Sequence, residues 1–337
     1  MKIIITIFFL INFLYSTITE LANKYYNKND FKKAEYLYKK ALDQGENKAI
    51  IYYNLANLYY LQTNIGKSID FYKKVINYAP NFKDSYLNIA KIFYSFENYY
   101  DSIVIIKDYI KLNNSDPEAF IMLGDIYKKI RSFGKADYYY LKSISLNKTN
   151  EDAYISYASL YIDLKDYDKA FDIIETGLLN IENSFNLLKL ESDIYKLKGK
   201  YSDAAIILQF ILNKIKTIKN QDKITIYNEL SELLLQAGYL NSAIEILKKS
   251  ILLNPDNINT LLHLDLIYFD NKKYNEALNF YFKLFEINKI EAYKLIKKIL
   301  IYAYNEDDKL ISSIILKFYK TKNISDNISN LYNVKNY

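Results

Sequence analysis

Small residues recur in this sequence at a fixed interval, and this periodicity restricts the possible folds more than any other feature. They are Ala34, Ser68, Ser102, Ala136, Ala170, Ala204, Ala243 and Ala277. Successive members are 34 residues apart, except for one interval of 39. Biased composition cannot keep residues in phase over eight periods. The chain is therefore predicted to be an array of internal repeats.

Two more positions keep the same phase. Twelve residues before each small residue lies a second, mostly small one: Ala22, Ala56, Ala90, Gly124, Ala158, Ser192, Ser231 and, as the exception, Asp265. Nine residues before lies a large one: Tyr25, Tyr59, Phe93, Tyr127, Tyr161, Tyr195, Leu234 and Tyr268. Apolar residues at three- and four-residue spacing predict helices, with the small residues where the helices crowd closest. Short polar turns should separate successive helices, and Asp166 or Asp168 is expected to cap one of them.

In these positions the chain resembles the tetratricopeptide repeat, a helix–turn–helix unit of 34 residues. The resemblance covers residues 15–291 apart from an insertion at 219–223. In that frame the repeats are 15–48, 49–82, 83–116, 117–150, 151–184, 185–218, 224–257 and 258–291. The resemblance implies an all-α fold, a right-handed superhelical solenoid of stacked antiparallel helix pairs. The family's usual Trp near the repeat start is absent, since the sequence has no Trp.

The segments around the array have their own patterns. The insertion 219–223 is polar and follows a second helix that is expected to run unusually long, over residues 204–219. Residues 292–320 are apolar but lack the small-residue signature, which is typical of a capping helix pair. Residues 321–337 form a polar tail.

Residues 1–19 carry one charge, Lys2, followed by an apolar run that covers every side of a helix. This pattern indicates a signal peptide or a membrane anchor. The chain is then exported to the periplasm or medium, or associates with a membrane through residues 3–19. A cleaved signal is favoured because the run is short for a span of about 20 residues. The alternative is a helix packed on the first repeat of a cytoplasmic protein.

Composition excludes several kinds of chemistry. The chain has no Cys, so disulfides, thiolate metal sites and thiol catalysis are excluded. Its only histidine, His263, lies near Asp265 without further ligands at metal-binding spacing. The net charge of +6 comes from well-mixed charges with no basic block. We therefore predict no catalytic residue, no metal site, no cofactor and no nucleic acid partner.

The family resemblance implies a binding face, because first helices of successive repeats line the concave side that commonly holds a peptide or partner protein. In the first three repeats this mapping gives Asn23, Tyr26, Tyr53, Asn54, Asn57, Tyr60, Asn88, Lys91 and Tyr94 as candidate partner-binding residues. Asparagine amides donate to and accept from an extended backbone, and tyrosines flank its side chains. The competing interpretation is that Asn and Tyr are simply abundant in this chain, which has 37 tyrosines.

Some relatives grip a C-terminal carboxylate with Lys and Asn residues on these helices. Here Asn23 and Asn54 match two Asn positions, but the Lys positions hold Thr19 and Asp84. The set of Lys and Asn residues that binds a C-terminal carboxylate in those relatives is therefore incomplete here.

Taken together, the sequence predicts a non-catalytic scaffold or adaptor that binds a protein or peptide on its concave face. One alternative is a substrate-presenting accessory subunit of a separate enzyme, such as a glycosyltransferase. Another is a helical-repeat RNA-binding protein, which would show a steep dependence of affinity on salt.

Overall fold

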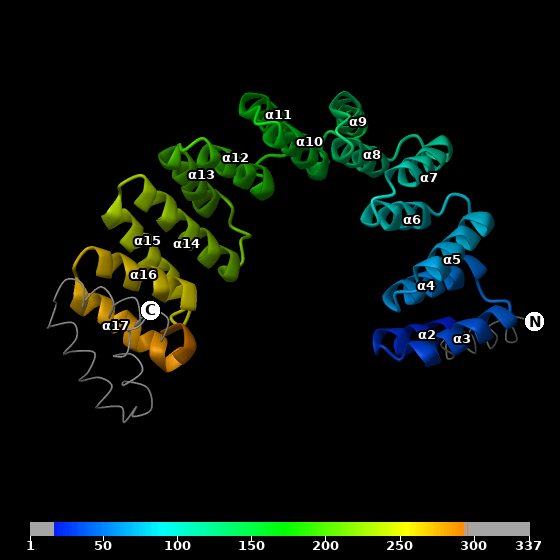
Figure 1. Cartoon of the computed structure of the whole chain (residues 1–337), viewed down its shortest axis with the longest axis horizontal. Coiled ribbons are helices and arrows are strands. Elements are labelled where there is room, and N and C mark those ends of the chain that lie inside the picture. The colour runs from blue at the N-terminus through cyan, green and yellow to red at the C-terminus, as the bar shows by residue number, and fades with distance from the viewer. Residues whose placement is uncertain (1–16, 293–294, 296–337) are drawn as a thin grey trace, which may run out of the picture. The chain divides into compact units, whose positions relative to one another are not determined.

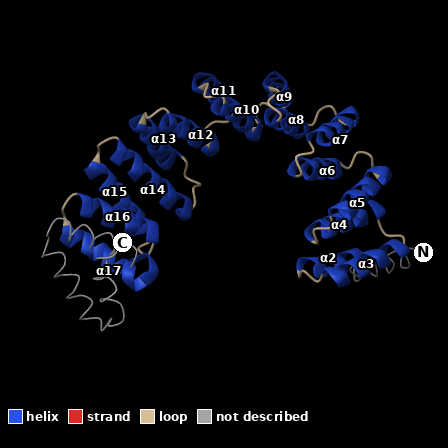
Figure 2. Cartoon of the chain, in the orientation of Figure 1, coloured by secondary structure: helices blue, strands red, loops and turns tan. Residues whose placement is uncertain are grey.

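The computed structural model describes residues 17–292 and residue 295, and within them the chain is helical without a strand (Figure 2). The helices follow one another in eight consecutive pairs, as predicted. They are α2 (Ile18–Asn27), α3 (Phe31–Asp43), α4 (Lys48–Leu61), α5 (Ile65–Tyr78), α6 (Lys83–Ser95), α7 (Tyr99–Leu112), α8 (Pro117–Lys129), α9 (Phe133–Leu146), α10 (Glu151–Asp163), α11 (Tyr167–Asn180), α12 (Phe185–Leu197), α13 (Tyr201–Lys214), α14 (Asn220–Gln236), α15 (Leu240–Leu253), α16 (Ile258–Asp270) and α17 (Tyr274–Ile287). The all-α class and the pairing of helices are confirmed.

The chain divides into two compact units, Met1–Glu182 and Asn183–Tyr337, here unit 1 and unit 2. Unit 1 contains helices α2 to α11, and unit 2 contains α12 to α17. Within unit 1, helices α2, α4, α6, α8 and α10 lie along one side and their partners along the other (Figure 1). We call the side formed by α2, α4, α6, α8 and α10 the first-helix face.

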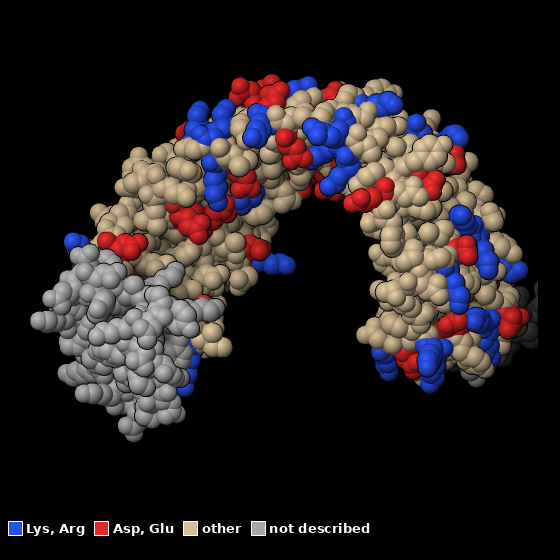
Figure 3. All heavy atoms as spheres, viewed as in Figure 1, with Lys and Arg blue, Asp and Glu red and all other residues tan. Residues whose placement is uncertain are grey.

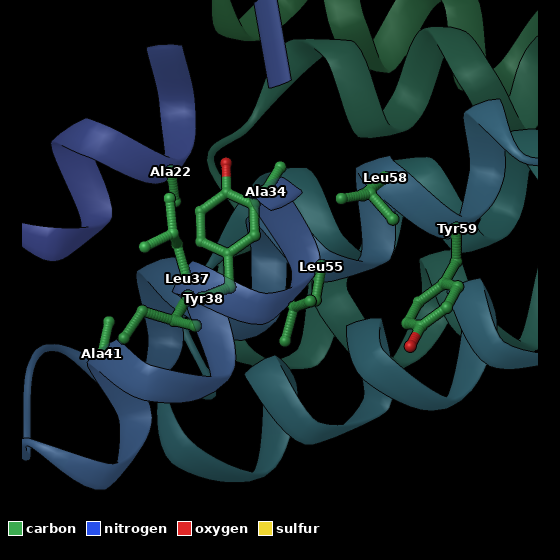
Figure 4. Packing of buried hydrophobic residues seen from close by; sticks show 9 residues of the cluster. Ala22, Ala34, Leu37, Tyr38, Ala41, Leu55, Leu58 and Tyr59 are labelled. Atoms are coloured by element: carbon green, nitrogen blue, oxygen red, sulfur yellow. The ribbon is translucent and has the colours of Figure 1, made fainter. Parts of the chain in front are cut away.

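The small positions lie where paired helices approach each other, and all sixteen of them are buried. At three of these positions a serine hydroxyl donates to a backbone carbonyl of the facing helix. Ser68 Oγ donates to the carbonyl of Ala56 at 2.9 Å, and Ser102 Oγ donates to that of Ala90 at 2.8 Å. Around Ala22 and Ala34, larger side chains including Tyr38 fill the remaining space between the first two pairs (Figure 4). Small residues therefore let the backbones approach closely, as expected.

The turn inside each pair repeats the same local geometry. Its second-to-last residue has a positive φ in all eight pairs: Asn29, Thr63, Glu97, Arg131, Lys165, Gly199, Gly238 and Lys272. The following residue then precedes the second helix as its N-cap. Asp166 does so as predicted, since its side chain accepts from the backbone N–H of Lys169. This shared turn sets the antiparallel packing of every pair.

One prediction near the insertion is wrong. The second helix before it, α13, ends at Lys214 and is no longer than its counterparts, because residues 215–219 form the connection. Residues 220–223 of the insertion instead belong to the first turn of α14, which has 17 residues. The extra residues thus lengthen a first helix rather than a second one.

The two ends of the chain carry predictions that lie mostly outside the described residues. These are the apolar segment up to residue 16, most of the capping pair 292–320 and the tail 321–337. Among the helices that the structure describes, none combines the length and hydrophobicity needed to cross a membrane. Thr17 is the N-cap of α2 and forms a capping box with Glu20.

Candidate functional site

All nine candidate binding residues lie on the first helices α2, α4 and α6 of unit 1. Hydrogen bonds connect Asn23 and Asn54 with Tyr38 of a second helix. A separate group connects Asn57, Asn88 and Tyr53 with Tyr72 of the next second helix. We call these seven residues the amide network. Each of its asparagines is only partly buried.

The first part of the amide network is centred on Asn23 of α2. Its Oδ1 accepts the hydroxyl of Tyr38 at 2.6 Å and the side-chain amide of Asn54 at 3.0 Å. Tyr38 comes from α3 and is buried, whereas Asn54 comes from α4 in the next repeat. These two bonds therefore connect one helix pair to the following one.

The second part repeats this arrangement one period later. The hydroxyl of Tyr72, on α5, donates to Asn57 Oδ1 on α4. Asn88 Nδ2, on α6, donates to Tyr72 Oη at 3.1 Å and lies 3.4 Å from Tyr53 Oη. The rings of Tyr53 and Tyr72 meet edge to face, with centroids 5.8 Å apart. The same chemistry thus links three consecutive repeats.

Two more candidates lie beside the amide network. Burial raises the pKa of Tyr26, and the nearby Tyr53 phenol adds to the effect. Tyr60 is 47% exposed and, with Tyr53 and Tyr26, contributes to the raised pKa of Tyr72, which burial dominates. Burial likewise raises the pKa of Tyr38 to about 12. The phenols of Tyr26, Tyr38 and Tyr72 are therefore neutral at physiological pH.

The remaining two candidates are not joined to the amide network. Lys91 is exposed on α6, and no described contact ties it to the other candidates. Tyr94 packs edge to face on Tyr99 with a centroid distance of 5.5 Å, and its pKa is raised by burial and by Asp125 of the fourth repeat. Tyr94 thus belongs to the neighbouring part of the face.

The sequence interpretation missed Tyr38 and Tyr72, because it considered first helices only. A signal for them was present. Each follows an asparagine of the network, Asn23 or Asn57, by 15 residues, and the two are 34 residues apart. In the fourth repeat Tyr140 stands at the same position and donates to Asp125 at 2.7 Å.

Charged side chains are distributed unevenly over the first helices of the repeats. The edge of unit 1 made by α2, α4 and α6 is largely uncharged, and the charged side chains of these repeats gather mainly on the opposite edge (Figure 3). Farther along unit 1, Lys128 pairs with Asp163 at 2.8 Å. In unit 2, Lys189 pairs with Asp193 at 2.7 Å and with Glu229 at 2.8 Å. The described ion pairs between charged side chains of different first helices thus lie beyond α2 and α4.

At one of the two positions where those relatives carry lysine, this chain places Thr19 beside an acidic side chain. Thr19 Oγ1 donates to Glu46 Oε2 at 2.5 Å, and the same carboxylate accepts the backbone N–H groups of Ile18 and Thr19. A C-terminal carboxylate at this point would meet like charge. The structure therefore adds a physical reason against carboxylate capture.

His263 and Asp265 do not form a joint site. His263 Nε2 lies 3.3 Å from Glu232 of the preceding pair, whereas Asp265 is buried among the helices of its own repeat. Within the described part of the chain, no group of three or more His, Asp or Glu side chains is arranged to hold a metal ion.

Comparison with known proteins agrees with this architecture. A family model described as "Tetratricopeptide repeat" matches residues 49–82, 117–150, 151–179 and 224–257. Each match begins at the start of a repeat as framed by the sequence periodicity. No curated protein matches the sequence significantly.

Solved structures resemble the chain at the level of fold. Yeast Tom70 is 17% identical, with a TM-score of 0.55, over 86% of this chain and 62% of Tom70. The chain thus spans less than two thirds of the Tom70 structure. The C-terminal part of a tetratricopeptide repeat-containing protein from Cytophaga hutchinsonii is 15% identical, with a TM-score of 0.53, over 72% of this chain and 98% of that structure.

Three observations agree on the family. Four segments match its repeat, the small positions keep their phase through eight helix pairs, and solved repeat proteins share the fold. These four segments of the chain are therefore tetratricopeptide repeats, and the other helix pairs keep the same phase.

Proposed function

We propose that the chain is a non-catalytic scaffold that binds an extended peptide, or an extended segment of a partner protein, on the first-helix face of unit 1. Tetratricopeptide arrays are generally protein-interaction scaffolds that present elongated surfaces. The observation that carries the proposal for this chain is the amide network, in which one hydrogen-bonded group connects α2 with α4 and a second connects α4 with α6.

The amide network supplies binding groups that are ordered before a ligand arrives. Amides held by buried phenols lose little conformational freedom on binding, so less of the interaction energy is spent on ordering them. Tyr26, Tyr53 and Tyr60 add aromatic surface that contacts many kinds of side chain. The lack of charge on this surface favours an uncharged stretch of peptide over an acidic or basic one.

A peptide selection tests this proposal. The full chain is immobilised and exposed to a random library of displayed 12-residue peptides, and selected peptides are measured by isothermal titration. The control is a chain with Asn54→Ala, Asn57→Ala and Asn88→Ala. Binding that the control loses, with its helical content intact, would support the proposal. Peptides that bind both chains equally would place the binding surface elsewhere.

We further propose that residues 1–19 direct export or anchor the chain in a membrane, with the support resting on their sequence. Thr17 and Glu46 cap and hold the first turn of α2. A cut after Thr19 would therefore destabilise the first repeat, and we expect any cleavage to precede Thr17. N-terminal sequencing of the native protein after cell fractionation tests both points. An intact N-terminus in the soluble cytoplasm would contradict them.

A further inference from the structure

We propose that Tyr38 and Tyr72 are positioning residues that fix the neighbouring amides, so that the first-helix face offers alternating hydrogen-bond donors and acceptors to a peptide main chain. This inference rests on the proposed function and specifies what the site reads. It assigns recognition to the backbone of the ligand rather than to its side chains.

The argument starts from the single proton of a phenol. The hydroxyl of Tyr72 lies between two amides, donating to Asn57 and accepting from Asn88. Because one hydroxyl has one proton to donate, it cannot donate to both amides. One amide must therefore turn its oxygen inward and the other its NH₂ group. The groups that they turn outward are consequently opposite in kind.

The same constraint applies one repeat earlier. Asn23 Oδ1 is occupied on the inside by Tyr38 and by the amide of Asn54. Asn23 therefore turns its NH₂ group outward, while Asn54 keeps its oxygen outward because its nitrogen is engaged. The phenol of Tyr38 is protonated at physiological pH, and burial raises its pKa further, to about 12, so this orientation does not change with pH in that range.

The outcome is an ordered series along the face. Asn23 and Asn57 present donors, whereas Asn54 and Asn88 present acceptors. Asn54 and Asn57 lie three residues apart on α4, which makes them neighbours on one helix surface. Donor, acceptor, donor and acceptor thus follow one another over three repeats.

This order fits the edge of an extended chain. In such a chain the N–H and C=O of one residue point to the same side, and those of the next residue point to the other side. Every second residue therefore offers one donor and one acceptor to the face. Polar side chains carry no such repeating pair, so the face should tolerate many sequences but reject a ligand whose inward N–H groups are blocked.

The test uses one 12-residue peptide from the selection described above, synthesised in two further forms. One form carries N-methyl groups on odd central residues, and the other on even central residues. We expect the full chain to bind one form at least tenfold more weakly than the other. In Tyr72→Phe, which retains the ring but not the hydroxyl, this discrimination should fall about three- to tenfold because Asn57 and Asn88 are no longer fixed.

An isosteric variant tests the direction of the amides. Asn57→Asp keeps an oxygen facing Tyr72 but replaces the outward donor with a carboxylate, so affinity for the unmodified peptide should fall at least tenfold. Tyr109→Phe is the matched control, since Tyr109 is a buried phenol of unit 1 that donates to Asp116, away from the amide network. It should leave both affinity and discrimination unchanged.

The outcomes separate this inference from the proposed function. Equal binding of the two methylated forms, discrimination that survives Tyr72→Phe, or unchanged affinity in Asn57→Asp would overturn the alternation while leaving peptide binding in place. A selection that yields no peptide would overturn the proposed function, and the inference with it.

Discussion

Asp265 occupies the position on α16 where the other repeats carry Ala, Gly or Ser. Its side chain is fully buried, and neither carboxylate oxygen has a hydrogen-bond partner. Burial raises the pKa of this carboxyl group to about 8, although the nearby Tyr281 backbone opposes the shift. The folded chain therefore holds Asp265 protonated at neutral pH, at a cost in stability.

Replacing Asp265 with Ser should remove this cost. The unfolded carboxyl group has a pKa of about 3.9. Since the folded pKa is higher, the wild-type free energy of unfolding should fall as pH rises from about 4 to about 8 through this group. Asp265→Ser should therefore be the more stable chain at pH 8, by about 1–3 kcal/mol, with a smaller difference at pH 5. Urea unfolding followed by circular dichroism at both pH values measures this. A pH-independent difference would mean that Asp265 is not the titrating group.

Gly124 on α8 shows why the small positions must be small. A Cβ atom there would lie 2.4 Å from Cε1 of Tyr140. Tyr140 is fully buried and donates to Asp125, so its ring has no room to move. Gly124→Ala should lower the free energy of unfolding by about 1–3 kcal/mol. Gly66→Ala on α5 is the control, because a Cβ there meets nothing within 4 Å. Equal melting temperatures of the two variants would refute the close approach at Gly124.

At the scale of the element, the turn inside each helix pair is the feature that the periodicity located but did not describe. The phase of the small residues predicts where each helix pair lies. The polar turn predicts Asp166 as an N-cap, and the structure confirms this cap. The sequence did not predict the positive φ of the residue before the N-cap, because six of the eight residues at this turn position are not glycine. Residue type therefore gave no signal, and the packing of the flanking helices imposes the conformation.

Thr63 is the least suited of these turn residues, because β-branched side chains strongly disfavour a positive φ. Its φ is 60°, and its side chain bonds only to the adjacent carbonyl of Gln62. Thr63→Gly should therefore raise the free energy of unfolding by about 0.5–1 kcal/mol. Gly199 occupies the equivalent turn four periods later with φ of 71°, so Gly199→Thr should lower it. Urea unfolding gives the free energy of unfolding of both variants. Changes of the same sign in Thr63→Gly and Gly199→Thr would contradict this explanation.

At the scale of the whole molecule, the sequence predicted the repeat array and the face on which the asparagines lie. It could not predict which side chains bond to each other, because Tyr38 and Tyr72 approach the network from second helices through tertiary packing. Nor could it show that the chain divides between Glu182 and Asn183. The repeat phase runs through that point without interruption, so only the contacts between elements reveal the division.

This division leads to a prediction about fragments. Repeats of a solenoid depend mainly on their neighbours, and every bond of the amide network lies within unit 1. A fragment of residues 17–182 should therefore fold with high helical content and bind the selected peptide within about threefold of the full-chain affinity. A fragment of residues 183–337 should show helix without binding. Circular dichroism and isothermal titration measure both properties. A folded 17–182 fragment that fails to bind would show that the ligand also needs groups outside unit 1. Binding by the 183–337 fragment would instead place the binding site in unit 2.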